Sequence, residues 1–393
     1  MDSGLEYENP LPAAEQALEW GNPEQAAQVG LGWYNLGTLR LQRRENAAAV
    51  EAFRQALVIA PRDVDTLYNL ALALTALDKP AAAAHYYHRA LAEAPRDHDI
   101  LYNLGLLYRK MGRYGEALRY LARLVELEPG HAPAYGHLGT ILAKLDDRPR
   151  AIACFEKLVE LGHKPESARH MLAALKGETT AAPPGEYVAA LFDQYADRFE
   201  GELMEQLGYR VPFLLAEMLR EVRGEKVFRR LLDLGCGTGL AGETFLSLAT
   251  DLVGVDLSGG MLDQARAKKI YTILHQENLL DFCRDCRDDF DLVVAADVLS
   301  YLGDLQPFFQ VVGRVLAPGG ELLLSVEEGR EGRDFLLRES GRYAHAPGYL
   351  EGLAAAAGLR RVTRRRTGLR RERDEWIYGW LYFFQHPDRG RSA

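Results

Sequence analysis

The stretch RRLLDLGCGTGLAG, residues 229–242, decides what kind of domain the second half of the chain forms. An apolar run leads directly into three glycines within five positions, Gly235, Gly237 and Gly239. Such a pattern is typical of a buried parallel strand whose loop lets a ligand approach the bare backbone. The dinucleotide-binding fingerprint G-x-G-x-x-G has its third glycine one residue later, where this chain has Leu240. The spacing therefore departs from that of a pyrophosphate-binding loop.

Apolar stretches alternate with helical patterns on both sides of this loop. We expect strands at 229–235, 251–257, 271–277, 290–297 and 320–327, with two more at 359–365 and 375–384. Strand–helix alternation of this kind indicates a doubly wound α/β sheet. The second strand ends at Asp256 in VGVDLSGGML, and a carboxylate there can accept hydrogen bonds from both hydroxyls of a ribose.

The glycine loop and GVDLSGGM together resemble the first motifs of class I methyltransferases, which use S-adenosylmethionine. The resemblance covers about 187–385 and implies a Rossmann-like, seven-stranded sheet whose last strand is antiparallel. It also implies where the cofactor binds. Asn278 stands where such enzymes often carry an adenine-binding Asp, and Asp297 ends the fourth strand near the methionine portion. The full set of expected cofactor residues is Tyr195, Gly235, Cys236, Gly237, Gly239, Asp256, Met261, Asn278, Leu279 and Asp297.

The segment LFDQYADRFE, residues 191–200, resembles the part that covers the cofactor in small-molecule methyltransferases of the biotin- and ubiquinone-synthesis kind. Tyr195 is the expected covering aromatic, with Phe192 and Phe199 beneath it, and simple amphipathic packing is the alternative. An alcohol or ammonium acceptor needs a base to remove its proton, whereas a carboxylate does not. Tyr301 and His345 are the candidate catalytic residues, with Glu327 less favoured. A capping or surface role is the alternative for His345.

A 34-residue repeat occupies the first half of the chain. The segments WYNLG (33–37), LYNLA (67–71), LYNLG (101–105) and YGHLG (135–139) recur in register, and so do alanines at 49, 83, 117 and 151. This resembles the tetratricopeptide repeat (TPR), whose helix pairs stack into a superhelix. The whole chain resembles a bacterial group of predicted methyltransferases with N-terminal TPR repeats. We expect a cap or partial repeat over 1–29, repeats over 30–175, a linker over 176–186 and a methyltransferase domain over 187–390.

Three asparagines, Asn35, Asn69 and Asn103, recur at one position of the repeat. A side-chain amide offers both a donor and an acceptor, so the three can bind the backbone of an extended peptide, or they can simply form a solvated face. If the asparagines bind a peptide, we expect the repeats to recruit a protein partner or a peptide substrate for methylation. Two alternatives stay open: a small-molecule methyltransferase whose repeats serve oligomerisation or scaffolding, and a scaffold that binds cofactor without catalysis.

Composition limits the partners and the location. A net charge of −9 argues against nucleic acid as a partner. The sequence contains no run of about 18 apolar residues, so we expect no membrane span. The N-terminus lacks the pattern of a signal peptide, and four scattered cysteines favour a reducing cytoplasm. Cys283 and Cys286 form a single C-x-x-C pair, from which we expect no metal site. We interpret one dense basic run as the solvated face of a terminal hairpin, with anion binding as the alternative: Arg360, Arg361, Arg364, Arg365, Arg366, Arg370, Arg371 and Arg373.

Overall fold

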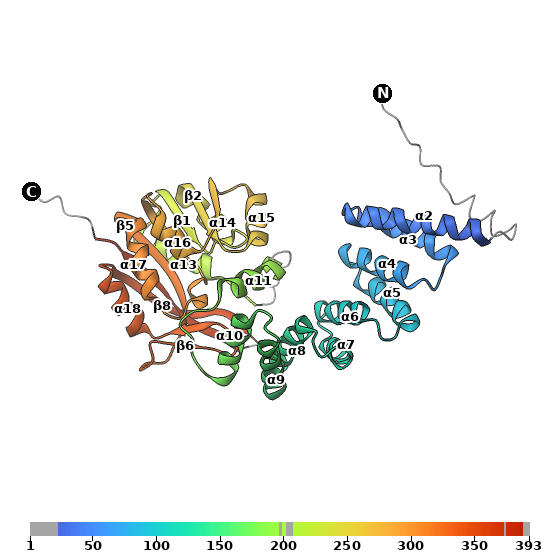
Figure 1. Ribbon diagram of the computed structural model, residues 1–393. Helices are drawn as coiled ribbons and strands as arrows, with labels where there is room; N and C mark the ends of the chain where they lie inside the picture. The colour runs from blue at the N-terminus through green and yellow to red at the C-terminus, as the bar shows by residue number, and fades with distance from the viewer. Residues whose placement is uncertain (1–22, 196–198, 202–206, 373–374, 388–393) are drawn as a thin grey trace, which may run out of the picture. The chain divides into compact units, whose positions relative to one another are not determined.

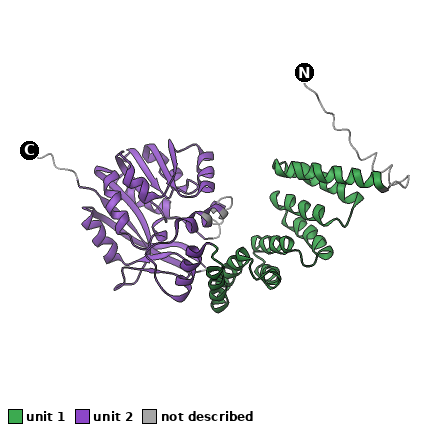
Figure 2. Cartoon of the chain, viewed as in Figure 1, with its two compact units in different colours: residues 1–163 green, residues 164–393 purple. Residues whose placement is uncertain are grey.

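The computed structural model describes residues 23–195, 199–201, 207–372 and 375–387 (Figure 1). The chain divides into two compact units, residues 1–163 and residues 164–393 (Figure 2). Most of the expected N-terminal cap, residues 1–22, lies outside the described part.

The described part of the first unit consists of helices joined in antiparallel pairs. The pairs are α2 (Pro23–Gln42) with α3 (Asn46–Ile59), α4 (Val64–Ala76) with α5 (Pro80–Glu93), α6 (His98–Lys110) with α7 (Tyr114–Leu127), and α8 (Ala132–Lys144) with α9 (Arg148–Glu160). Small residues let the paired helices approach closely: a Cβ atom at Gly105 would lie 2.5 Å from Leu121 Cγ. The four expected repeat units are therefore confirmed as helix pairs.

The second unit begins before the stretch that we expected to be a linker. Helix α10 (Pro165–Lys176) belongs to this unit, where His170 Nε2 donates to the Gly341 carbonyl at 3.2 Å. The Thr180 and Tyr343 hydroxyls lie 2.5 Å apart, and the Leu337 amide donates to Thr179 Oγ1 at 3.3 Å. Residues 176–186 are thus held against the sheet by hydrogen bonds and do not form a free tether.

The sheet of the second unit has nine described strands: β1 (Phe228–Leu234), β2 (Ala249–Asp256), β3 (Ile273–Gln276), β4 (Phe290–Ala295), β5 (Leu316–Glu328), β6 (Phe335–Leu337), β7 (Tyr343–His345), β8 (Arg360–Glu372) and β9 (Glu375–Gln385). Strands β3, β2, β1, β4 and β5 are neighbours in that order and parallel. β9 pairs antiparallel with β5, and β8 with β9. The seven expected strands and the antiparallel last strand are confirmed, and the short β6–β7 pair is an addition that the sequence did not predict.

Helices cover both faces of this sheet (Figure 1). They are α11 (Gly185–Tyr195), α12 (Phe199–Gly201), α13 (Val211–Arg223), α14 (Leu240–Phe245), α15 (Gly259–Lys268), α16 (Leu279–Asp285), α17 (Gln306–Val315) and α18 (Pro347–Ala356), with 3-10 turns η3 (Leu246–Leu248) and η4 (Leu299–Tyr301). The strands carry continuous apolar runs and are therefore buried on both faces of the sheet. One apolar core lies on each face. Among the described helices, none combines the length and the hydropathy that a membrane span requires.

The parallel strands bring their carboxyl ends to one edge of the sheet. The glycines follow β1, Asp256 is the last residue of β2, and Asp297 follows β4. This edge is where ligands bind in open α/β sheets, and it therefore defines the candidate site.

Candidate functional site

The glycine loop has the backbone conformation that only glycine adopts freely. Gly235, Gly237 and Gly239 have φ values of +71°, +52° and +93°. A Cβ atom at Gly235 would lie 2.6 Å from Val298 Cβ, whereas a Cβ atom at Gly237 would meet nothing within 4 Å. Gly235 is thus needed for packing against the loop after β4. Gly237 presents bare backbone to open space, as a loop that receives a cofactor must.

Asp256 joins the loop after β1 to the loop after β2. Its Oδ2 accepts a hydrogen bond from the Gly237 amide at 2.8 Å, and its Oδ1 accepts one from the Ser258 amide at 2.9 Å. Burial raises the pKa of this carboxyl, while the backbone amides favour its charged form. Met261 lies in the first turn of α15 and is 1% exposed. Asp256 is therefore fixed beside the glycine loop, whereas Met261 is buried and its contact with a cofactor stays a prediction.

Asp233 is a buried acid that the sequence patterns described above did not single out. It lies on β1 with 1% exposure, and the Tyr271 hydroxyl donates to its Oδ2 at 2.6 Å. Burial raises its pKa to about 7. An acidic residue among the leucines at 231, 232 and 234, just before the glycine loop, was the available signal.

Asn278, the residue expected to contact adenine, has a structural role. It is the N-cap of α16, and its Oδ1 accepts a hydrogen bond from the Leu280 amide at 2.9 Å. This satisfies one of the free amides at the start of the helix. Leu279 begins the helix and packs against the apolar core. The cap accounts for Asn278 without a ligand, so its contact with adenine stays a prediction.

Asp297 follows β4 in a strained conformation, with a φ of +62°. Its amide donates to Ser325 Oγ at 2.8 Å, and its Oδ1 accepts from Arg342 Nη2 at 2.6 Å. The same guanidinium donates to the Tyr301 hydroxyl and lies 4.5 Å from the centre of the Tyr301 ring. Arg342 thus links Asp297 to Tyr301, and no sequence pattern predicted a role for this arginine.

Glu327 and His345 are fully buried side chains. Glu327 Oε1 accepts from Arg342 Nε at 2.7 Å and from Arg370 Nη2 at 2.8 Å. The His345 ring is neither a helix cap nor on the surface, because it lies on β7 and its Nε2 contacts the Leu302 and Gly303 carbonyls at 2.9 and 3.0 Å. Burial lowers its pKa to about 4, so the ring is neutral and acts as a donor to the backbone.

Helix α11 contacts both ends of this edge. The Ser258 hydroxyl donates to Asp193 Oδ1 at 2.5 Å, and the Phe192 ring meets the Tyr301 ring edge-on with centroids 5.0 Å apart. The helix therefore links the loop after β2 to the loop after β4. The side chains of Tyr195 and Phe199 lie outside the described residues, so the covering role of Tyr195 stays a prediction.

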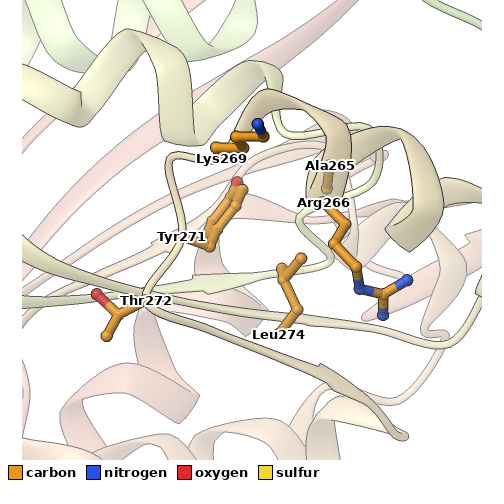
Figure 3. A pocket seen from close by; sticks show the side chains of 6 residues that line it. All are labelled: Ala265, Arg266, Lys269, Tyr271, Thr272 and Leu274. Carbon is orange, nitrogen blue, oxygen red and sulfur yellow. The ribbon is translucent and has the colours of Figure 1, made fainter.

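A pocket lies beside α15 (Figure 3). Its volume is about 190 Å³, and it is lined by Ala265, Arg266, Lys269, Tyr271, Thr272 and Leu274. None of these residues belongs to the glycine loop or to the loops after β2 and β4. Among the described residues, no group of three His, Cys, Asp or Glu side chains is placed to hold a metal ion.

The repeat asparagines make contacts within the helical stack. Asn69 Nδ2 donates to the Tyr34 hydroxyl at 3.3 Å, and Asn103 Nδ2 donates to the Tyr68 hydroxyl at 3.0 Å. Asn35 lies exposed on α2. Two of the three amide nitrogens thus link each repeat to the one before it.

The basic run lies on β8, and most of its described members pair with carboxylates. Arg361 and Arg364 contact Glu351, Arg365 contacts Glu221, and Arg366 contacts Glu328 at 2.7 Å. Arg370 differs, because it is only 5% exposed and contacts Glu327. The interpretation as a solvated hairpin face fits the paired arginines and fails for Arg370. Arg373 lies outside the described residues.

Comparison with known proteins assigns the two parts of the chain to different families, and the repeat match extends to residue 175, within α10. Residues 232–322 match the family described as a methyltransferase domain, and residues 34–98, 68–132 and 108–175 match families described as tetratricopeptide repeats.

Several curated relatives are ubiquinone biosynthesis O-methyltransferases. The protein from Chelativorans sp. (strain BNC1) is 27% identical over 183 residues, which are 42% of this chain and 72% of that protein. The mitochondrial protein of Homo sapiens is 28% identical over 128 residues, which are 30% of this chain and 35% of that protein. The protein from Nitrobacter winogradskyi is 33% identical over 98 residues, which are 24% of this chain and 38% of that protein. The chain thus spans little more than a third of the length of the last two relatives.

Solved structures with partial likeness include two methyltransferases. The N-methyltransferase NodS from Bradyrhizobium japonicum WM9, in complex with S-adenosyl-L-homocysteine, has 24% identity and a TM-score of 0.37 over 44% of this chain and 86% of that one. The 1,6-didemethyltoxoflavin-N1-methyltransferase of Burkholderia thailandensis has 18% identity and a TM-score of 0.42 over 54% of this chain and 95% of that one. The family matches and the sheet order thus identify a methyltransferase domain in the second unit, with a tetratricopeptide-repeat region ahead of it.

Proposed function

We propose that the second unit transfers the methyl group of S-adenosylmethionine to an acceptor, and that the repeat region recruits a protein partner or a peptide that carries the acceptor. The observation that carries the cofactor site is the 2.8 Å hydrogen bond between the Gly237 amide and Asp256 Oδ2. It fixes bare backbone and a carboxylate side by side at the carboxyl edge of the sheet, which suits the ribose and methionine portions of one ligand.

The bound cofactor supplies an electrophilic methyl group on a sulfonium. The chain has to hold the reactants in line and exclude water, which is how most of such a rate enhancement arises. Asp256 would accept hydrogen bonds from the ribose hydroxyls, and the backbone of Gly235–Gly239 would lie against the methionine portion. Helix α11, held at Ser258 and at Tyr301, would close the site from above.

Calorimetry with S-adenosylmethionine and with NAD tests this assignment. We expect binding of S-adenosylmethionine, and an Asp256→Ala variant should bind it about 10- to 150-fold more weakly, since a hydrogen bond to a charged group contributes roughly 1.5–3 kcal/mol. Asp263→Ala is the matched control, because Asp263 lies on α15 and pairs only with neighbouring Arg266 at 2.5 Å among the interactions found for it. Tighter binding of NAD than of S-adenosylmethionine would contradict the proposal.

Recruitment by the repeats needs its own test. A lysate is incubated with the protein and a labelled methyl donor, and macromolecules are then separated from metabolites. An Asn69→Ala/Asn103→Ala double variant should lower labelling of macromolecules if the repeat surface delivers the acceptor. Because both amides also link repeats, thermal unfolding of the variant must first show that the first unit remains folded. Unchanged labelling by the folded variant would count against recruitment through this surface.

A small-molecule acceptor is the second candidate. It is favoured by the contact between Phe192 of α11 and Tyr301, which would leave the acceptor enclosed, and by the names of the curated relatives. In the same lysate experiment this alternative predicts label in the metabolite fraction. The third possibility, a scaffold that binds cofactor without transfer, predicts no label in either fraction. The cytoplasmic location expected from the cysteines stays a prediction.

A further inference from the structure

A buried ion cluster lies at the carboxyl ends of β4 and β5. We define it by Asp297, Tyr301, Glu327, Arg342 and Arg370. Arg342 contacts three of the other members, with Nη2 2.6 Å from Asp297 and Nε 2.7 Å from Glu327, and Arg370 Nη2 lies 2.8 Å from Glu327. The side chains of the four charged members are between 0% and 15% exposed. Such a cluster needs nearly complete pairing to be stable in this environment.

The cluster adjoins the proposed methyl donor. Val298 directly follows Asp297, and it is the residue that a Cβ atom at Gly235 would strike. The loop after β4 therefore touches the glycine loop. Tyr301 lies at the end of the same loop and contacts Phe192 of α11. Of the cluster, Tyr301 is thus the member placed between the glycine loop and the covering helix.

Within the described residues of this cluster, both carboxylates are paired with guanidinium groups. Glu327 is desolvated, yet the guanidinium groups of Arg342, Arg370 and Arg338 hold its pKa at about 2. Asp297 is paired with Arg342, and the buried His345 ring donates from Nε2 to two backbone carbonyls. His345 Nδ1 has no hydrogen-bond partner in the described structure, but burial lowers the pKa of the ring to about 4. These groups are therefore weak bases, poorly suited to general base catalysis.

Tyr301 is placed to donate a hydrogen bond and not to accept a proton. Its oxygen accepts a hydrogen bond from Arg342 Nη1, so its own proton is left to donate. A second donor, Arg370 Nη1, is buried without a hydrogen-bond partner in the described structure and lies 3.8 Å from Asp297 Oδ1. The described residues of the cluster therefore offer donors and guanidinium charge, which suit an anionic oxygen, and offer no strong base that would deprotonate an alcohol or an ammonium.

We propose that the methyl acceptor is a carboxylate, which the Tyr301 hydroxyl and the guanidinium of Arg342 behind it orient toward the methyl group. This proposal rests on the proposed methyltransferase function. In the reaction, a carboxylate oxygen forms a bond to the methyl carbon while the sulfur–carbon bond breaks, and the electron pair of that bond stays on sulfur. The products are a methyl ester and the neutral thioether, and no proton moves.

The stability of the product in alkali tests the acceptor class. The full-length protein is incubated with an extract of the cells that make it and with S-adenosylmethionine labelled in the methyl group. Labelled products are then treated with alkali, which hydrolyses methyl esters to volatile methanol and leaves methyl ethers and methylamines intact. We expect most of the label to be released as methanol. Label that survives alkali overturns the carboxylate.

A pair of tyrosine variants tests the role of Tyr301. Tyr301→Phe removes the hydroxyl and keeps the ring under Arg342, so ester formation should fall about tenfold with cofactor affinity unchanged. Tyr378→Phe is the matched control, because Tyr378 also lies beneath a guanidinium, that of Arg366 at 4.4 Å, but is 44% exposed on β9. Equal activity of the two variants overturns the role of Tyr301.

Two failures can be told apart. If calorimetry shows no binding of S-adenosylmethionine, the proposed function itself fails. If the cofactor binds and the extract gains no label that alkali releases, the carboxylate proposal fails and the cofactor site stands.

Discussion

Replacement of Gly237 with alanine tests the central claim about the cofactor loop. The residue has a φ of +52°, and an added Cβ atom would meet nothing within 4 Å. The only folding cost is the left-handed conformation, about 1–2 kcal/mol for an L-residue. Since domains are typically stable by roughly 5–15 kcal/mol, the variant should remain folded.

The same methyl group should be costly once the cofactor is bound. It projects from the loop into the space where backbone and ligand would meet. Overpacking by one methyl typically costs about 1–3 kcal/mol, which corresponds to roughly 5- to 150-fold in affinity. We therefore expect Gly237→Ala to bind S-adenosylhomocysteine at least about fivefold more weakly.

The assay combines thermal unfolding with calorimetry and includes a matched control. Gly358 follows α18, has a φ of +77° and also has no atom within 4 Å of an added Cβ. Gly358→Ala should lower the melting temperature to a similar extent and leave the affinity for the cofactor unchanged. Gly235→Ala should be less stable than either, because its Cβ atom would overlap Val298. Tight cofactor binding by Gly237→Ala, equal to that of the unaltered protein, would refute the assignment of the loop.

Three further predictions concern stability. Asp233 has a pKa of about 7 in the folded protein and about 4 in the unfolded chain. The free energy of unfolding should therefore fall by roughly 3 kcal/mol between pH 5 and pH 8 as the buried carboxyl loses its proton. In denaturant unfolding, the Asp233→Asn variant should lose correspondingly less stability over the same pH range. Gly105→Ala should destabilise the first unit by about 1–3 kcal/mol through overlap with Leu121, measured as a lower melting temperature; an unchanged value would contradict the close helix approach. Asn103→Ala should lower the free energy of unfolding by about 1 kcal/mol, because it removes the hydrogen bond to Tyr68. Adding Tyr68→Phe to this variant should cause no further loss of stability, since the hydrogen bond is already absent.

The strands and repeats could be predicted because their signals are local. Apolar runs specify buried strands, and the recurrence of small and large residues at a 34-residue period specifies stacked helix pairs. The β6–β7 pair could not be predicted, since strands of three residues carry no measurable alternation. Nor could the start of the second unit at Lys164, because the residues that hold α10 and 176–186, such as Gly341 and Tyr343, lie more than 150 positions away.

The candidate site divides in the same way. That the glycine loop and Asp256 lie together could be predicted, because both follow the carboxyl ends of recognisable neighbouring strands. Their contacts with a cofactor stay predictions. Arg342 had no signal, and Arg370 was counted with an exposed run from which its burial separates it. His345 was weighed as a base or a surface residue, and only packing against Leu302 and Gly303 decided that its ring is buried.

Local patterns in the chain specify the order of elements, the repeat and the residues that backbone geometry requires, because each depends on neighbours within a few positions or on a constant period. Long-range packing alone settles which charges meet at the carboxyl edge of the sheet. Asp297, Glu327, Arg342 and Arg370 come from four separate segments, and their pairing depends on strand register and burial, which no local pattern records. Whether a polar side chain there serves as base, donor or buried partner follows from those contacts.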